Sequence, residues 1–187
     1  MSCARTRPRE SGVGISVGRV SETQVLVRPA RATDVRRIRE VTSPYVDSRA
    51  IVPKPAVSYY ESLQEFLVAE IDVVIVGCGA LHVMWDDVAE IRTLAVDRRA
   101  KGHGVGSRIV RELLDRARQL EVERVFCLTF ETEFFGRHGF VEIEGAPVEP
   151  AVYAELLQSY DEGVAEFLDL DRVKPNTLGN TRMLLTF

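Results

Sequence analysis

The stretch "AEIRTLAVDRRAKGHGVGSRIV", residues 89–110, decides the fold of this chain. It reads as an apolar strand over 89–96, then a basic loop with glycines at 102, 104 and 106, then the start of an amphipathic helix over 104–120. One apolar stripe marks that helix: Ile109, Val110, Leu113, Leu114, Ala117 and Leu120. The first backbone N–H groups of a helix are unpaired and carry partial positive charge, so this order predicts an anion site at the helix start.

The loop before the helix favours a phosphate group as that anion. Arg98, Arg99 and Lys101 add positive charge, and the glycines let the backbone come close to a ligand. The spacing is G-x-G-x-G rather than G-x-G-x-x-G, and no acidic residue ends a neighbouring strand about 20 residues later, which weakens a dinucleotide interpretation. The P-loop pattern is not found. An ordinary strand-to-helix turn is the alternative.

The rest of the chain predicts an α+β fold, a mixed sheet with helices on both faces. Expected strands cover 25–29, 66–71, 73–83, 124–130, 139–143 and 181–187. Further helices are expected after Thr33 as N-cap, over 58–66 and over 132–138, and 48–58 is expected to be a loop because of its two prolines. Residues 147–180 form an acidic, helix-containing excursion, and 1–23 are expected to be a disordered arm ahead of one domain over 24–187.

Composition narrows the functional classes. The net charge of −4 argues against general nucleic-acid binding. The longest apolar run, 73–84, contains two glycines and a histidine, so no membrane span is expected. The three cysteines, Cys3, Cys78 and Cys127, lie far apart without metal spacing and are interpreted as free thiols in a reducing cytoplasm. The histidines form no metal pattern either, so no metal is expected.

Two motifs now carry a family resemblance. Arg99-Ala100-Lys101-Gly102-His103-Gly104 has the form R/Q-x-x-G-x-G, and "FFGRHGF" (134–140) is similar to F-Y-x-x-x-G-F. Over about 25–145 the chain resembles the GNAT superfamily of acetyl-CoA-dependent N-acetyltransferases. The resemblance implies a GNAT-like mixed, mostly antiparallel sheet of about seven strands with helices on both faces, and acetyl-CoA as co-substrate.

A narrower resemblance covers nearly all of 25–187. "VFCLTFETEFFGRHGF" and the tail "KPNTLGNTRMLL" are similar to the acetyltransferase domain of N-acetylglutamate synthases, above all the short stand-alone amino-acid N-acetyltransferases of bacterial arginine biosynthesis. This implies acetyl transfer to the α-amine of L-glutamate or L-glutamine, the first step of arginine biosynthesis. The alternatives are an enzyme for another amine, such as a peptide, a lysine or a drug, and a non-catalytic acetyl-CoA-binding module.

The resemblance also implies a cofactor site. The backbone N–H of Leu94 is the expected oxyanion donor, and Ala95 and Val96 are expected to pair with the pantetheine amides. Phe135 stands where the family often has a tyrosine that protonates the leaving thiolate, so water, or Tyr153 or Tyr160 from the excursion, would have to replace it. The remaining cofactor contacts are expected from Arg99, Lys101, Gly102, His103, Gly104, Val105, Gly106 and Ser107.

The acceptor end needs a base and cations. An amine must lose its proton before it attacks, so a general base is useful. The resemblance implies that Glu90 is this base, because it stands on the strand where many GNAT enzymes carry their catalytic glutamate. Strand alternation predicts that Glu90, Arg92, Leu94 and Val96 share one face. The candidates for binding the acceptor are Arg92, Lys54, Thr129 and Arg182, each with a surface cation or strand hydroxyl as the plainer interpretation. The excursion is either a lid over the acceptor or a contact in a homodimer.

Overall fold

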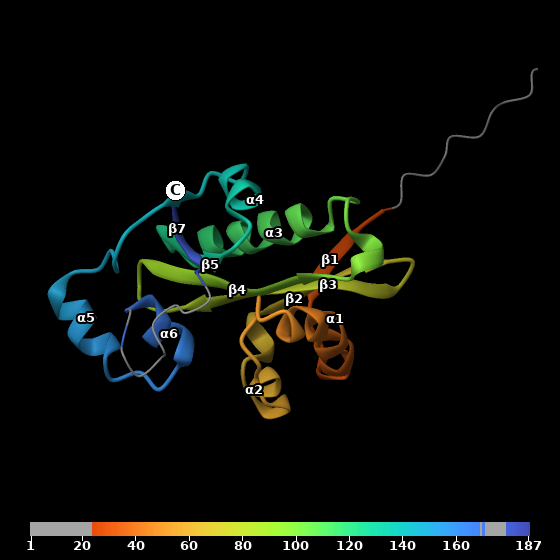
Figure 1. Cartoon of the computed structure of the whole chain (residues 1–187), viewed down its shortest axis with the longest axis horizontal. Coiled ribbons are helices and arrows are strands. Elements are labelled where there is room, and N and C mark those ends of the chain that lie inside the picture. Colours follow the sequence, from red (N-terminus) through yellow and green to blue (C-terminus); the bar gives the residue numbers. More distant parts are fainter. Residues whose placement is uncertain (1–23, 169, 171–178) are drawn as a thin grey trace, which may run out of the picture.

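The computed structural model describes residues 24–168, 170 and 179–187, and it confirms the expected sheet (Figure 1). The seven strands lie in the order β1-β2-β3-β4-β5-β7-β6, antiparallel except for the parallel pair β4–β5. Their bounds are β1 Leu26–Pro29, β2 Phe66–Ile71, β3 Val74–Val83, β4 Val88–Val96, β5 Arg124–Thr129, β6 Val141–Glu142 and β7 Thr181–Thr186. The predicted arm 1–23 lies outside the described residues.

Helices cover both faces of the sheet, as predicted. On one face, α3 (Val105–Gln119) packs its apolar stripe against the strands, with α4 (Thr132–Gly136) nearby. Glycine permits this contact, since a Cβ on Gly79 would lie 2.9 Å from Ile109. The other face carries α1 (Val35–Asp47) and α2 (Ala56–Glu61). The excursion supplies α5 (Pro150–Leu156) and α6 (Glu162–Phe167), which cover the β5–β7 end.

A β-bulge in β4 changes which side chains share a face. Cys78 pairs with Ala95 and Ala80 with Arg92, so Thr93 and Leu94 both lie opposite the single residue Gly79. Thr93 accommodates the extra residue with a positive φ of 57°. The predicted alternation is therefore wrong beyond Arg92: Leu94 and Val96 pack toward α3, whereas Glu90 and Arg92 point to the opposite face.

The parallel pair β4–β5 separates soon after it forms. Pairing covers only Val88 to Glu90 against Arg124 to Phe126, although β4 continues to Val96 and β5 to Thr129. Two adjacent strands that stop pairing leave backbone and side chains free to line an opening. This divergence, together with the bulge, positions the site described below.

Two predicted boundaries on the α1 and α2 side are wrong. Thr33 lies within a short 3-10 turn (Ala32–Asp34), and α1 has Asp34 as its N-cap residue. The Asp34 carboxylate instead accepts the backbone N–H of Arg31 at 2.7 Å. The expected loop ends early, because Pro55 is the N-cap residue of α2, a position compatible with its fixed φ and missing N–H. A 3-10 turn (Leu63–Glu65) then leads into β2.

Candidate active site

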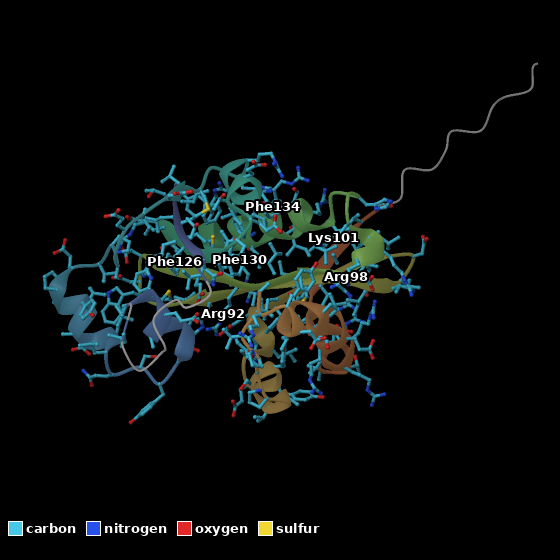
Figure 2. The ribbon with its side chains drawn as sticks, viewed as in Figure 1. Arg92, Arg98, Lys101, Phe126, Phe130 and Phe134 are labelled. Atoms are coloured by element: carbon cyan, nitrogen blue, oxygen red, sulfur yellow. The ribbon has the colours of Figure 1, made fainter. Side chains whose placement is uncertain are left out.

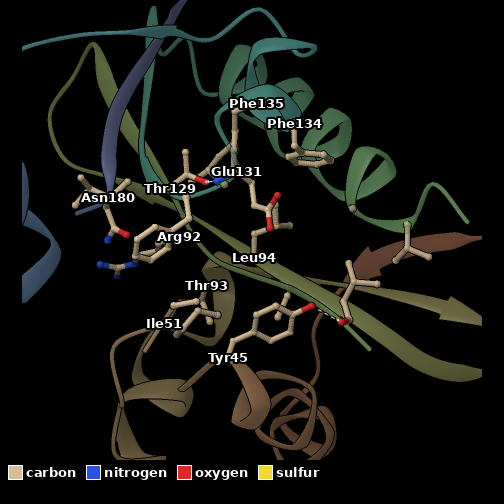
Figure 3. Close-up of a pocket in the computed structure, with 18 of the residues that line it drawn as sticks. Tyr45, Ile51, Arg92, Thr93, Leu94, Thr129, Glu131, Phe134, Phe135 and Asn180 are labelled. Carbon is tan, nitrogen blue, oxygen red and sulfur yellow. Dashed lines mark hydrogen bonds between the residues drawn. The ribbon is translucent and has the colours of Figure 1, made fainter. Parts of the chain in front are cut away.

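A cavity of about 570 Å³ occupies the opening between β4 and β5 (Figure 3). Its walls come from β4, the end of β5, the loop before α3, the α1–α2 loop and α6. Most of the predicted site residues line it: Lys54, Glu90, Arg92, Leu94, Ala95, Val96, Lys101, Gly102, Gly104, Val105, Gly106, Ser107, Thr129 and Phe135. The structure thus brings together segments that are more than 70 residues apart in the chain.

The loop end of the cavity has the geometry of an anion site. Gly102 and Gly104 adopt φ of 84° and 73°, a conformation that residues with a side chain rarely adopt. Gly104 is the N-cap residue of the 15-residue helix α3, whose first residues line the cavity. Lys101 lies over the ring of Tyr45, with Nζ 5.3 Å from the ring centroid. Arg98 and Lys101 lie toward the opposite end of β4 from Arg92 (Figure 2).

An ion pair holds this loop in place. The Asp97 carboxylate accepts the backbone N–H of Arg99 at 3.0 Å and the Arg37 guanidinium at 2.7 Å. These two bonds keep the pKa of Asp97 below its usual range. Arg37 also donates to the carbonyl of Ile75 at 3.0 Å, so α1, β3 and the loop are tied together.

Three predicted residues do not line the cavity. Arg99 contacts Asp97 through its backbone, and His103 is exposed, with Nδ1 3.1 Å from the carbonyl of Lys101. Arg182 points to the excursion, where its guanidinium donates to the carbonyls of Glu166 and Phe167; it also donates to the carbonyl of Gly145, just before the excursion, and lies over the Phe126 ring. The geometry gives Arg182 a structural role, because backbone carbonyls already take up its donors.

Glu90 occupies the other end of the cavity and is almost completely buried, with 4% of its surface exposed. Its Oε2 accepts no hydrogen bond from the described residues. Among the described residues, the nearest cationic atom is Nη1 of Arg92 at 4.0 Å. The pKa of Glu90 is raised to about 7, mainly by burial; Arg92, Lys54 and His82 oppose this rise, and the nearby Glu166 adds to it. Such a carboxyl can take up and release a proton near neutral pH.

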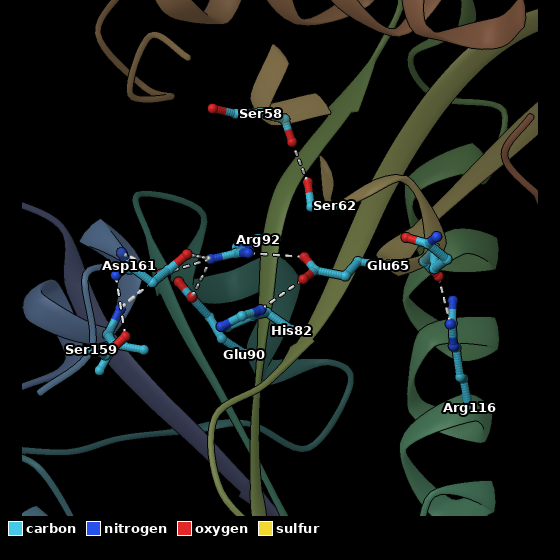
Figure 4. A network of polar contacts seen from close by, with 12 residues as sticks. Ser58, Ser62, Glu65, His82, Glu90, Arg92, Arg116, Ser159 and Asp161 are labelled. Atoms are coloured by element: carbon cyan, nitrogen blue, oxygen red, sulfur yellow. Dashed lines mark hydrogen bonds and ion pairs between the residues drawn. The ribbon is translucent and has the colours of Figure 1, made fainter. Parts of the chain in front are cut away.

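Arg92 is held by carboxylates on both sides (Figure 4). Nη2 donates to Glu65 at 2.9 Å, and Nη1 donates to both oxygens of Asp161 at 2.9 and 3.1 Å. Glu65 in turn contacts Nδ1 of His82 at 2.8 Å. The expectation that Arg92 alone clamps an incoming carboxylate is therefore weakened, because both of its terminal nitrogens already donate to protein carboxylates.

Lys54 is a cation with free donors at this end. It is half-buried and lines the cavity, and among the described residues its ammonium has no hydrogen-bond or ion-pair partner. Burial lowers its pKa, and Arg92 lowers it further, while Glu90, Asp161 and Glu65 oppose this. An ammonium group in such a place would gain from an anionic partner.

The remaining predicted residues have mixed roles. Thr129 is buried in the cavity wall, and its hydroxyl accepts the backbone N–H of Glu131 at 2.9 Å. Phe135 is buried against Phe134 and Phe140 and offers no proton. Neither tyrosine suggested as its substitute lines the cavity: Tyr153 lies 3.4 Å from the carbonyl of Leu168, and Tyr160 is 98% exposed.

Several residues of the site were not found by sequence reasoning. Tyr45 lines the cavity and donates to the carbonyl of Val96 at 2.7 Å, and Ile51 lies beside it. Glu65, Asp161 and Gly163 complete the acceptor end. Their contacts span up to 69 positions in sequence, so no local pattern could have indicated them.

Within residues 24–168, 170 and 179–187, no three His, Cys, Asp or Glu side chains gather as metal ligands would. In the same residues, no helix is both long and apolar enough to cross a bilayer. Cys78 and Cys127 are buried free thiols, whereas Cys3 lies outside the described residues.

A glycine loop at a helix start, a split parallel strand pair and a buried carboxylate line one cavity, an arrangement suited to an enzyme that transfers a group from a phosphate-containing donor. The model of the acetyltransferase (GNAT) family matches residues 33–140, more than half of the chain. The chain belongs to this acetyltransferase (GNAT) family.

Within this family, the chain is similar to amino-acid acetyltransferases. An amino-acid acetyltransferase of Mycobacterium tuberculosis is 54% identical over 170 residues, which cover 89% of this chain and 97% of the relative. A crystal structure of Rv2747 from Mycobacterium tuberculosis in complex with CoA and NLQ has a TM-score of 0.84 at 55% identity, covering 87% of this chain and 99% of that one. An amino-acid acetyltransferase of Neisseria meningitidis is 32% identical over 133 residues. These residues make up 70% of this chain but only 30% of that longer relative.

The fold extends to a more distant enzyme. The N-acetylglutamate synthase from Neisseria gonorrhoeae, complexed with coenzyme A and N-acetyl-glutamate, has a TM-score of 0.69 at 22% identity. The match covers 87% of this chain and 35% of that one. At this identity the likeness concerns the fold.

Proposed function

We propose that this protein transfers the acetyl group of acetyl-CoA to the α-amine of L-glutamate or L-glutamine, the first step of arginine biosynthesis. The observation that carries the proposal is the buried Glu90, whose Oε2 has no partner, in the same cavity as the glycine loop at the start of α3. The 54% identical amino-acid acetyltransferase supports an amino acid as acceptor. The cytoplasm as location and a homodimer as assembly stay predictions.

The donor would bind along the cavity with its pyrophosphate at the loop. The backbone N–H groups around Gly102 to Gly106 and the Lys101 ammonium would hold the phosphates. The pantetheine arm would run along the unpaired part of β4 beside Ala95 and Val96. The thioester would then lie near the bulge, where the backbone N–H of Leu94 is the proposed donor to the oxyanion.

The chemistry then follows from the position of Glu90. Its carboxylate takes a proton from the α-ammonium of the acceptor, and the neutral nitrogen attacks the thioester carbon. The nitrogen, now positively charged in the tetrahedral intermediate, gives a second proton to solvent; the intermediate then collapses, the C–S bond breaks and the thiolate leaves. A CoA thiol with a pKa of about 8.5 is a tolerable leaving group that solvent can protonate, so Phe135 needs no acidic substitute.

Lys54 is the proposed partner of the acceptor's α-carboxylate, because its donors are free. Arg92, held by Glu65 and Asp161, would keep Glu90 in place and contribute its remaining donors to the acceptor side chain. Besides the α-carboxylate that both acceptors carry, the glutamate side chain would bring a second negative charge to a region rich in carboxylates. The glutamine side chain would bring no charge. Both remain in the proposal.

The test is CoA release from acetyl-CoA by the purified protein with a panel of amino acids, a peptide amine and a buffer blank. Turnover confined to glutamate or glutamine is the expected result. Turnover on the peptide alone would keep the fold and replace the acceptor. No turnover, with acetyl-CoA still bound in calorimetry, would indicate the binding-module alternative.

Asp97→Ala should weaken acetyl-CoA binding selectively. The variant loses the carboxylate that fixes the loop through Arg99 N–H and Arg37. We expect the KM for acetyl-CoA to rise ~10-fold, about the value of one charge-assisted hydrogen bond, with the acceptor KM unchanged. Steady-state kinetics measure both, and Asp115→Ala, which removes an exposed ion pair with Arg118, is the matched control. Equal changes in the two KM values would contradict the role of Asp97.

A further inference from the structure

We propose that Asp161 and Gly163 are positioning residues for acetyl transfer: they fix α6 against Glu90 and Arg92 and so form the wall of the acceptor end. The inference rests on the proposed function, since it assigns roles within the same site. The α6 helix of the excursion then forms part of the acceptor pocket and is not a loosely attached segment.

Asp161 connects two structures at once. Its Oδ1 accepts the backbone N–H groups of Gly163 at 2.8 Å and Val164 at 3.1 Å, which caps α6. Both of its carboxylate oxygens also accept Nη1 of Arg92. One carboxylate therefore starts the helix and joins it to the strand that carries Glu90 (Figure 4). Glu65 holds the opposite side of the same guanidinium.

Gly163 lies where an added side chain would have to displace charged groups of the site. A Cβ there would lie 2.7 Å from Oε2 of Glu90, 3.0 Å from Oδ1 of Asp161 and 3.1 Å from Nη1 of Arg92. The requirement is steric, because three charged groups meet the same backbone position. The backbone of α6 thus lies close to the proposed base, and Gly163 also lines the cavity.

The far side of α6 is fixed as well. Val164, Phe167 and Leu168 are buried in a cluster with Val88 and Phe126 of β4 and β5. The Phe167 and Phe126 rings meet edge to face at 5.0 Å. Arg182 donates to the last carbonyls of the helix. Held at both ends and along its apolar side, α6 acts as a wall whose position sets that of Glu90.

Gly163→Ala tests the contact with the base. The methyl group must displace Glu90 or α6, so we expect kcat/KM for the acceptor to fall ~100-fold, the scale reported for small misplacements of reacting groups. The KM for acetyl-CoA should change less than ~2-fold, because the loop end is untouched. Gly136→Ala is the matched control, since a Cβ there meets no described atom within 4 Å. Equal kinetics for Gly163→Ala and wild type would overturn the proposal.

Asp161→Asn tests the charge while keeping an oxygen that can cap α6. Arg92 would lose one anionic partner and attract the Glu90 carboxylate more strongly, so the acidic limb of kcat/KM should move to lower pH. Lys54, His82 and Glu166 also act on Glu90 and stay unchanged. Asp115→Asn, at an exposed ion pair, should leave the limb in place. An unshifted limb in Asp161→Asn would mean that Asp161 is only a helix cap.

A readout without turnover separates this inference from the proposed function. Trp85 is the single tryptophan of the chain and packs against the α6 cluster. Its emission should shift in Gly163→Ala but not in Gly136→Ala, whichever amine the enzyme accepts. If wild type turns over no amino acid and the emission still shifts, the function fails and the α6 contact stands. If wild type is active and neither emission nor kinetics respond, the positioning role is refuted.

Discussion

Glu90→Gln is expected to lower kcat at pH 7 by ~10²- to 10⁴-fold, the usual contribution of a general base. The amide has nearly the shape of the carboxyl group but cannot take the proton from the acceptor ammonium. Activity should partly recover at high pH, where more of the amine is neutral. Steady-state rates from pH 6 to 10 measure both effects.

The pH dependence of wild-type activity should also reflect the protonation of Glu90. Because the pKa of Glu90 is raised to about 7, the base is protonated and inactive below that pH. The kcat/KM for the acceptor should therefore fall with a single-proton limb near pH 7, and Glu90→Gln should lose that limb. A variant that kept the wild-type profile would remove Glu90 from the mechanism.

A stability measurement guards against a trivial loss of folding. The folded-state pKa of about 7 lies above the ordinary 4.5, so Glu90 favours the folded state below pH 4.5 and loses that contribution as the pH rises through 7. Glutamine carries no buried charge at any pH. Glu90→Gln should therefore melt a few degrees above wild type at pH 8 and close to it at pH 4.5. If Glu90→Gln were both inactive and less stable than wild type, loss of folding could explain the lost activity. Only the pH profile would then test the catalytic role of Glu90.

Lys54→Met is expected to raise the acceptor KM ~10²-fold, the scale for removing one partner of a buried charge pair. Methionine keeps the apolar length of the side chain and loses the ammonium that the α-carboxylate would contact. The KM for acetyl-CoA should stay within ~2-fold of wild type, because the loop end of the cavity is distant.

Lys101, the other lysine that lines the cavity, provides a control in which the other substrate should be affected. Lys101→Met should raise the KM for acetyl-CoA and leave the acceptor KM unchanged, since Lys101 lies at the phosphate end over Tyr45. Initial rates with each substrate varied in turn distinguish the two lysines. If both variants affect the same substrate, Lys54 does not bind the acceptor carboxylate.

The fold was largely predictable because its signals are local. The strand, basic glycine loop and amphipathic helix of 89–120 stand in one stretch, and the seven strands follow from short apolar runs. The cavity residues of this stretch were predicted from the R/Q-x-x-G-x-G motif and the family resemblance, which Arg99 and His103 do not follow into the cavity. Glu90 was likewise predicted from the resemblance, because it stands on the strand where many family members carry their catalytic glutamate.

The failures concern effects that no short pattern encodes. The bulge at Thr93 reversed the faces of Leu94 and Val96, because nothing in "RTLAV" indicates an extra residue opposite Gly79. Arg182 was a plausible substrate contact by charge, but it binds the carbonyls of the excursion. Asp161 and Gly163 reach the site from far along the chain, where only tertiary packing reveals their contacts.

The β4 bulge makes this strand sensitive to its length as well as to its composition. Before Thr93, even-numbered side chains lie on the face of the sheet that carries α1, α2 and α6; after it, Ala95 lies on that face, while Leu94 and Val96 face α3. Deleting one residue here would restore regular alternation and rotate either the base or the donor-binding backbone out of the cavity. Among natural variants and engineered libraries, single-residue insertions and deletions between Glu90 and Val96 should therefore be lost, even where conservative replacements survive.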